Sequence, residues 1–126
     1  MKKYRQMRKV KSAIDAWKYV QPLDLENEKR ERLICLYLQS DGTVLGWNDQ
    51  TENNVMISLC SLLSVEQVLL VTNHPDGNSL PTKEDIEKTK SIKELLDAVK
   101  IGIRDHIIVG CKEFYSYADE KITFIR

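Results

Sequence analysis

Three runs of consecutive apolar residues mark the chain, and none of them alternates with polar positions. They are Leu33–Leu38 (LICLYL), 68–71 (VLLV) and 107–109 (IIV). A strand that is exposed on one face alternates, whereas a strand that is covered on both faces is apolar throughout. These runs therefore predict three central strands of a sheet that other elements cover on both sides.

Apolar residues at helical spacing fill the segments between and before these runs. They predict helices over 13–20, 56–65 and 82–100. Ser12 precedes the first helix, and Asn53 or Asn54 precedes the second. Because serine and asparagine side chains accept hydrogen bonds from the free N–H groups of a first turn, we expect them to cap these helices.

Turn residues complete the pattern. SDGT follows the first apolar run and VLGWN fits the returning strand of a hairpin, while FYSYAD and KITFIR fit a closing pair of strands. Strands interleaved with helices, with hairpins at both ends, predict the α/β class. We expect a single-domain, three-layer-like sandwich in which helices pack on a mixed, largely antiparallel sheet.

Composition narrows the class of protein. The chain has 126 residues, 42% hydrophobic and 30% charged, with no net charge, which suits one ordinary globular domain. No apolar stretch approaches the ~20 residues that span a bilayer, so we expect no membrane contact. Cys35, Cys60 and Cys111 form no Cys-x-x-Cys pair. This excludes a thiolate zinc site and a disulfide framework, and it favours a cytoplasmic protein.

Charge is unevenly distributed at the N-terminus. Residues 1–11 contain six Lys or Arg and no acid, so we interpret them as a basic N-terminal arm. A run of this kind is ordinarily a solvated terminus. A nucleic-acid partner, bound through its phosphates, is the alternative interpretation.

Several segments, taken in order, point to a family. LICLYLQSDGTVLG is followed by VEQVLLVTNHPDGNSLPTKED, and then by IGIRDHIIVG and FYSYADE. Over 12–126 this order resembles the RadC-like proteins, whose domain has the JAMM/MPN metalloprotease-like and cytidine-deaminase-like fold. The second segment is similar to the family signature His-Asn-His-Pro-Ser-Gly followed by Pro-Ser-x-x-Asp. Longer members also carry an N-terminal region of helix-hairpin-helix character, which we expect this chain to lack.

The resemblance assigns positions to a metal site. The three ligands of the family fall on Thr72, His74 and Asp85, so the first histidine is a threonine in this chain. Thr82 takes the place of a serine that lies near the reacting carbonyl in JAMM proteins. Asp76 replaces the serine of the loop and is a possible substitute ligand, in a site whose oxygen atoms would favour a harder ion than zinc.

JAMM enzymes also use a glutamate that activates the zinc-bound water. The family's Gly-Thr segment is missing from GWNDQTENNVMIS, and we place the counterpart of the glutamate at Asn48, an amide that cannot accept a proton. Asp49 and Glu52 are alternatives if the loop is shifted. A catalytic zinc site needs about three protein ligands and a base. With one ligand and the base lost, we expect no cofactor, and zinc only if the site is functional.

The residues that match the family motif also have an ordinary structural explanation. Thr82-x-x-Asp85 has the spacing of a capping box at the start of a helix, and His74 can hydrogen-bond its own loop. His106 is a single histidine in an apolar strand, where a hydrogen-bonded core histidine is the usual case. None of these roles requires an ion.

Three functions are compatible with these patterns. The first is a catalytically degenerate RadC-like domain that binds an unknown protein or peptide partner. The second is a JAMM-type zinc metallohydrolase that cleaves peptide or isopeptide bonds. The third is a nucleic-acid-associated module, suggested by the basic arm and by the family's association with DNA repair. We favour the first and expect an inactive enzyme, because the metal ligands are incomplete.

Overall fold

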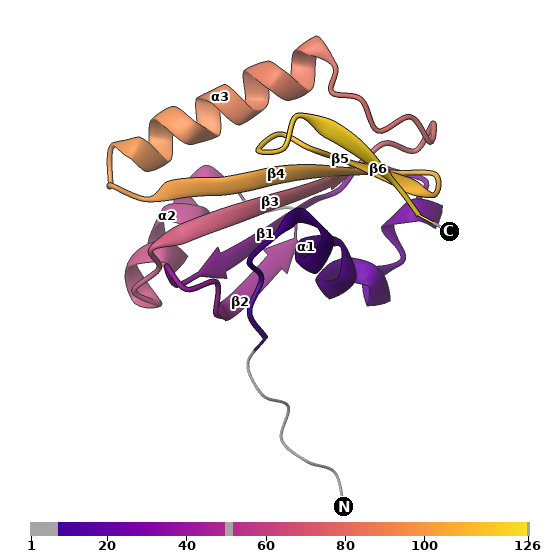
Figure 1. The fold of residues 1–126 in the computed structure, drawn as a ribbon. Coiled ribbons are helices and arrows are strands. Elements are labelled where there is room, and N and C mark those ends of the chain that lie inside the picture. The colour runs from indigo at the N-terminus through magenta and orange to yellow at the C-terminus, as the bar shows by residue number, and fades with distance from the viewer. Residues whose placement is uncertain (1–7, 50–51, 126) are drawn as a thin grey trace, which may run out of the picture.

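A computed structural model describes residues 8–49 and 52–125 of the chain, and Figure 1 shows its arrangement. In chain order the elements are α1 (Ala13–Val20), the 3₁₀ turns η1 (Gln21–Leu23) and η2 (Leu25–Asn27), β1 (Leu33–Leu38), β2 (Val44–Asp49), α2 (Asn53–Leu62), β3 (Gln67–Asn73), α3 (Lys83–Asp97), β4 (Gly102–Gly110), β5 (Glu113–Ser116) and β6 (Lys121–Phe124).

Within these residues the strands form one six-stranded sheet in the order β2-β1-β3-β4-β5-β6. β3 and β4 run parallel and are joined through α3, whereas the other neighbouring pairs are antiparallel. Figure 1 shows α3 over one face of the sheet and α1 under the other. The predicted three-layer sandwich with a mixed, largely antiparallel sheet is therefore confirmed.

The central strands divide two apolar cores between the faces of the sheet. On β1, Ile34, Leu36 and Leu38 point to the face covered by α1, and the alternate residues point to the face covered by α2 and α3. Every residue of β1 is buried, as is each residue of 68–71 and 107–109. Burial on both faces explains why these runs carry no polar alternation, and it confirms them as central strands.

α1 spans the predicted residues, whereas α2 and α3 differ from the predicted ranges 56–65 and 82–100. Ser12 caps α1 by accepting a hydrogen bond from the backbone N–H of Asp15. The prediction that Asn53 or Asn54 caps the second helix was wrong. The extended backbone ends at Glu52, so Asn53 already belongs to α2, and no side chain caps this helix. α3 ends before the predicted Lys100, whose left-handed backbone (φ 62°) turns the chain toward β4.

The end of the predicted basic arm is part of the fold. The backbone N–H of Val10 donates to Gly42 at 2.7 Å, and the N–H of Val44 donates to the carbonyl of Arg8 at 2.9 Å. Val10 is buried. Gly42 has a left-handed backbone (φ 91°), and a side chain at this position would collide with the backbone carbonyl of Val10. Residues 1–7 of the arm lie outside the described residues.

No helix of the described residues is long and apolar enough to cross a membrane.

Candidate functional site

The predicted metal motif lies where β3 ends. Thr72 and Asn73 close this strand, His74 follows it directly, and Asp85 lies in the first turn of α3. Leu33 of β1 pairs with Thr72, and extending this antiparallel register by two residues sets Glu31 opposite His74. The side chains of Glu31, His74 and Asp85 each offer a ligand atom, and these atoms all lie within 4.8 Å of one another.

The two ring nitrogens of His74 face two different acceptors. Nδ1 lies 2.7 Å from the backbone carbonyl oxygen of Asn78, and Nε2 lies 2.8 Å from Oδ2 of Asp85. A carbonyl oxygen only accepts, so Nδ1 carries a hydrogen atom. The imidazole and the carboxylate each offer a ligand atom that could bind the same metal ion.

Asp85 is held in its ionised form mainly by Thr82. Burial raises the pKa of Asp85, but hydrogen bonds from the N–H and hydroxyl of Thr82, together with the charge of His74, outweigh burial and lower this pKa below its ordinary value. Oδ2 of Asp85 accepts from both groups of Thr82, at 2.7 and 2.9 Å, and Oγ1 of Thr82 accepts from the N–H of Asp85. This is the capping box that the Thr-x-x-Asp spacing predicted.

Thr72 is bonded to a buried histidine. Its Oγ1 lies 2.9 Å from Nε2 of His106, and Nδ1 of His106 lies 2.7 Å from Oγ1 of Thr89. The hydroxyl of Thr89 donates to the carbonyl of Asp85, so it accepts from Nδ1–H, and Nε2 accepts from the hydroxyl of Thr72. Burial lowers the pKa of His106 to about 4, which keeps the ring neutral at pH 7. His106 is thus the hydrogen-bonded core histidine that the sequence favoured.

Asn73 ties the segment that carries Glu31 to β3. Its carboxamide oxygen accepts from the N–H of Arg32 at 2.7 Å, and its amide nitrogen donates to the carbonyl of Arg30 at 3.1 Å. The two bonds flank Glu31 on both sides along the chain. Because Asn73 is almost completely buried, these bonds form without competition from water, and they hold the backbone of Glu31 beside His74.

The remaining predicted residues lie elsewhere. Asn48, the position proposed for the lost base, pairs with Cys35 on β1 and accepts from the hydroxyl of Tyr37 at 2.9 Å. Its row of the sheet continues through Cys35 to Leu70, four positions before His74. The alternative Asp49 accepts from Arg32. Asp76 is exposed and accepts from the N–H of Asn78, so it shapes the loop.

Sequence reasoning missed Glu31 because it lies in the charged segment ahead of β1 and 43 positions before His74. A signal was present nonetheless. Once Leu33–Leu38 and 68–71 are taken as antiparallel neighbours, the few residues before the first run and the few residues after the second come to the same edge of the sheet. Glu31 is the acid at that place.

Comparisons with known proteins agree with the resemblance. A family model described as "RadC-like JAB domain" matches residues 10–122. The UPF0758 protein of Chlorobaculum parvum is 28% identical over 124 residues, which cover 91% of this chain and 55% of that protein. The UPF0758 protein of Syntrophotalea carbinolica is 31% identical over 107 residues, which cover 78% of this chain and 47% of that protein. The chain spans about half the length of these curated relatives.

Proposed function

Because the chain belongs to the RadC-like JAB domain family, we propose that it is a catalytically degenerate member that acts by binding a protein or peptide partner. One observation carries the proposal: the site groups one imidazole with two carboxylates, those of Glu31 and Asp85. A hydrolytic zinc site uses three protein ligands, leaves one position for water, and needs a further group that takes a proton from this water.

Glu31 can fill only one of the two missing roles. If Glu31 serves as the third ligand beside His74 and Asp85, no base is left at the grouped residues. If Glu31 serves as the base, two ligands are left for the metal. The hydroxyl of Thr72 does not supply the missing zinc ligand, because it donates to His106 and binds zinc more weakly than imidazole or carboxylate does. The residues present therefore do not fit a hydrolytic zinc centre.

The shape of the site does not depend on a metal ion. The capping box positions Asp85, Asn78 holds the ring of His74, and Asn73 fixes the backbone beside Glu31. These bonds support a surface that persists after catalysis is lost. The role in DNA repair that the family resemblance implies stays a prediction.

The second candidate, a metallohydrolase of peptide or isopeptide bonds, is favoured by the position of Glu31. With a third ligand from outside the grouped residues, His74 and Asp85 would hold zinc, which would supply an acidified water. Glu31, an exposed carboxylate at the same site, would accept the proton. A carboxylate at position 48 would then not be needed, because Glu31 would be the base.

Metal analysis separates the two candidates. We expect the purified protein to hold well under one equivalent of zinc, and a chelator to leave its melting temperature unchanged, because a bound metal would stabilise the folded state by mass action. Thr72→His restores the third ligand and should raise zinc affinity by about 10-fold or more. His74→Ala in the Thr72→His background is the control and should cancel this gain. Stoichiometric zinc in the unmodified protein, lost in both His74→Ala and Asp85→Ala, would favour the hydrolase.

A further inference from the structure

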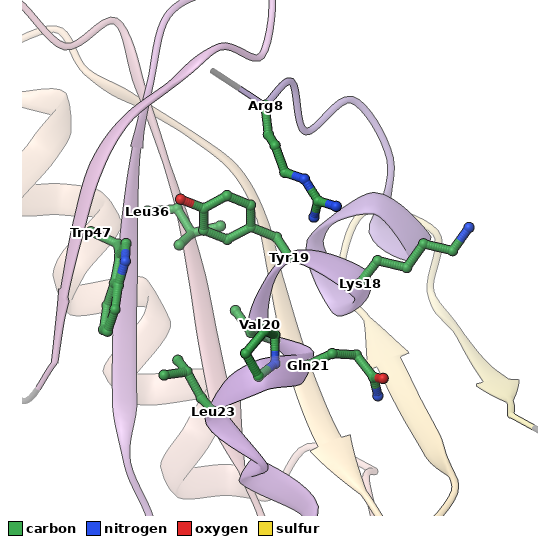
Figure 2. Close-up of a pocket in the computed structure, with 9 residues that line it drawn as sticks. Arg8, Lys18, Tyr19, Val20, Gln21, Leu23, Leu36 and Trp47 are labelled. Atoms are coloured by element: carbon green, nitrogen blue, oxygen red, sulfur yellow. The ribbon is translucent and has the colours of Figure 1, made fainter. Parts of the chain in front are cut away.

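A groove separates α1 and η1 from the edge of the sheet, on the face that α1 covers (Figure 2). Trp17 of α1 stacks on Phe114 of β5, with ring centroids 6.1 Å apart, so α1 packs toward β4 and β5. On this face β1 is buried, whereas the edge strand β2 is only partly covered. The groove has a volume of about 610 Å³, within the range of ligand sites, and it shares no residue with the Glu31, His74 and Asp85 group.

Aromatic and aliphatic side chains form the inside of the groove. Figure 2 shows Tyr19 reaching from α1 toward Leu36 of β1 and Trp47 of β2, with Leu23 on the η1 side. Trp47 is 44% exposed, so its ring is accessible from the groove. Neither Trp47 nor Tyr19 takes part in the ring pairs found within the described residues. Both rings can therefore stack on a ligand.

The charge of the groove has one sign. Arg8 and Lys18 line it, and none of the described lining residues is acidic. Within the described part of the chain, neither side chain has an ion pair or hydrogen bond. Arg8 is held in place through its backbone, because its carbonyl accepts from the N–H of Val44. A cationic rim without internal partners is complementary to an anionic ligand.

A second hollow continues this cationic rim. It has a volume of about 270 Å³, shares Arg8, Lys18 and Tyr19 with the groove, and adds Lys9. Its acid, Asp15, accepts from the backbone N–H of Lys11. Lys9 pairs with Asp41 at 3.3 Å, so Arg8 and Lys18 are the cations that the two hollows share. Two such cations favour a ligand with more than one negative charge over one with a single carboxylate.

We propose that this groove binds single-stranded nucleic acid, with a base stacked on Trp47 and Tyr19 and the neighbouring phosphates at Arg8 and Lys18. Flat aromatic groups at regular intervals along a polyanion are the property that separates this ligand from an acidic peptide. A duplex keeps its bases stacked inside, so the strand must be single. This inference goes beyond the proposed function and does not depend on it.

The test uses the full chain and fluorescein-labelled oligo-dT of about ten nucleotides, a length in the range that one such groove accommodates. At low salt we expect saturable binding by anisotropy, with quenching of tryptophan fluorescence. The logarithm of the binding constant should fall with the logarithm of salt concentration with a slope of about −0.7 per phosphate contact. Trp47→Ala should weaken binding about 5- to 100-fold, and Trp47→Phe, which keeps an aromatic face, should weaken it less.

Charge variants complete the experiment. Arg8→Gln should weaken binding and make the salt slope shallower by about 0.7. The matched control is Lys93→Gln, because Lys93 is exposed on α3, outside the groove, and should change neither quantity. Circular dichroism of each variant checks that it is folded. The proposal is overturned by absence of binding, by equal binding of polyglutamate, by an unchanged affinity of Trp47→Ala, or by equal losses in Arg8→Gln and Lys93→Gln.

Discussion

At position 72 a hydroxyl stands where the family motif has an imidazole, and its partner is another imidazole, that of His106. The hydroxyl satisfies a ring nitrogen that is buried away from water, and Thr89 satisfies the other. Tyr117 stacks on the same ring, with centroids 4.7 Å apart. A single side chain that differs from the motif is therefore embedded in a complete hydrogen-bond chain, which explains how the fold accommodates a threonine at this position.

His106 makes stability depend on pH. Its pKa is about 4 in the folded protein against an ordinary value of 6.5, so the unfolded chain binds more protons between these values. Stability is therefore lost as the pH falls through this window, by on the order of 3 kcal/mol from this residue. We expect urea unfolding of the wild type to show this loss between pH 7 and pH 4.

The matched variant for this measurement is His106→Gln. It should be less stable than the wild type at pH 7 but lose less stability on acidification. Asp105, whose pKa burial raises, acts with the opposite sign, so the difference between wild type and variant is the quantity to compare. Equal pH dependence in the two proteins would show that His106 does not titrate as the geometry implies.

Elements meet at the site through their ends. Glu31 lies two residues before β1, His74 directly follows β3, and Asp85 lies in the first turn of α3. The carboxamide of Asn73 is the direct tie between the first two elements, since it bonds the backbone on both sides of Glu31. Strand pairing sets the register, and this tie extends it to the residues before the first residue of β1.

Loss of the tie should be measurable as loss of stability. Asn73→Ala removes two hydrogen bonds. The backbone N–H of the half-buried Arg32 loses its acceptor, and the backbone carbonyl of Arg30 loses its donor. We expect a decrease of roughly 2 kcal/mol in the free energy of unfolding, measured by urea denaturation. Asn27→Ala is the control, because Asn27 is exposed and its side chain donates to the nearby Asp24 at 2.9 Å. It should change stability by less than about 0.5 kcal/mol. Similar losses in the two variants would contradict the tie.

The whole molecule is a sheet between two cores, and its cysteines report on this arrangement. All three are free and lie within the described residues: Cys35 and Cys60 are buried on the face covered by α2 and α3, whereas Cys111 is exposed. Burial raises the pKa of Cys35 to about 12 and also raises the pKa of Cys60. The thiolate is the reactive form of cysteine. Both core cysteines should therefore react slowly, because reagents cannot reach them and because their thiols stay protonated.

Thiol labelling tests this arrangement of the two cores. In the native state we expect one thiol, that of Cys111, to react rapidly with a disulfide reagent, and three to react in denaturant. Cys111→Ser should abolish the fast reaction, and Cys60→Ser should leave it intact. Fast labelling of two or more thiols in the native wild type would show that the α2–α3 side of the molecule is open.

Interactions between near neighbours in the chain were readable from the sequence. Apolar runs without alternation indicated the central strands, Ser12 and the Thr82-x-x-Asp85 spacing indicated the starts of α1 and α3, and the motif order indicated the family. Each of these depends on residues a few positions apart, so the sequence displays it directly. The cap of α2 was predicted wrongly because residue type alone does not fix the position at which the backbone becomes helical.

Only the tertiary structure decided which distant groups meet. Glu31 reaches His74 through the antiparallel register of β1 on β3, Thr72 reaches His106 through the parallel register of β3 and β4, and Asn48 lies apart from both. The groove beside Trp47 exists because α1 packs toward β4 and leaves the edge of the sheet only partly covered. Register and layer packing are settled by burial over the whole sheet, where a shift of one residue would reverse every side chain on a strand. No local pattern contains that information.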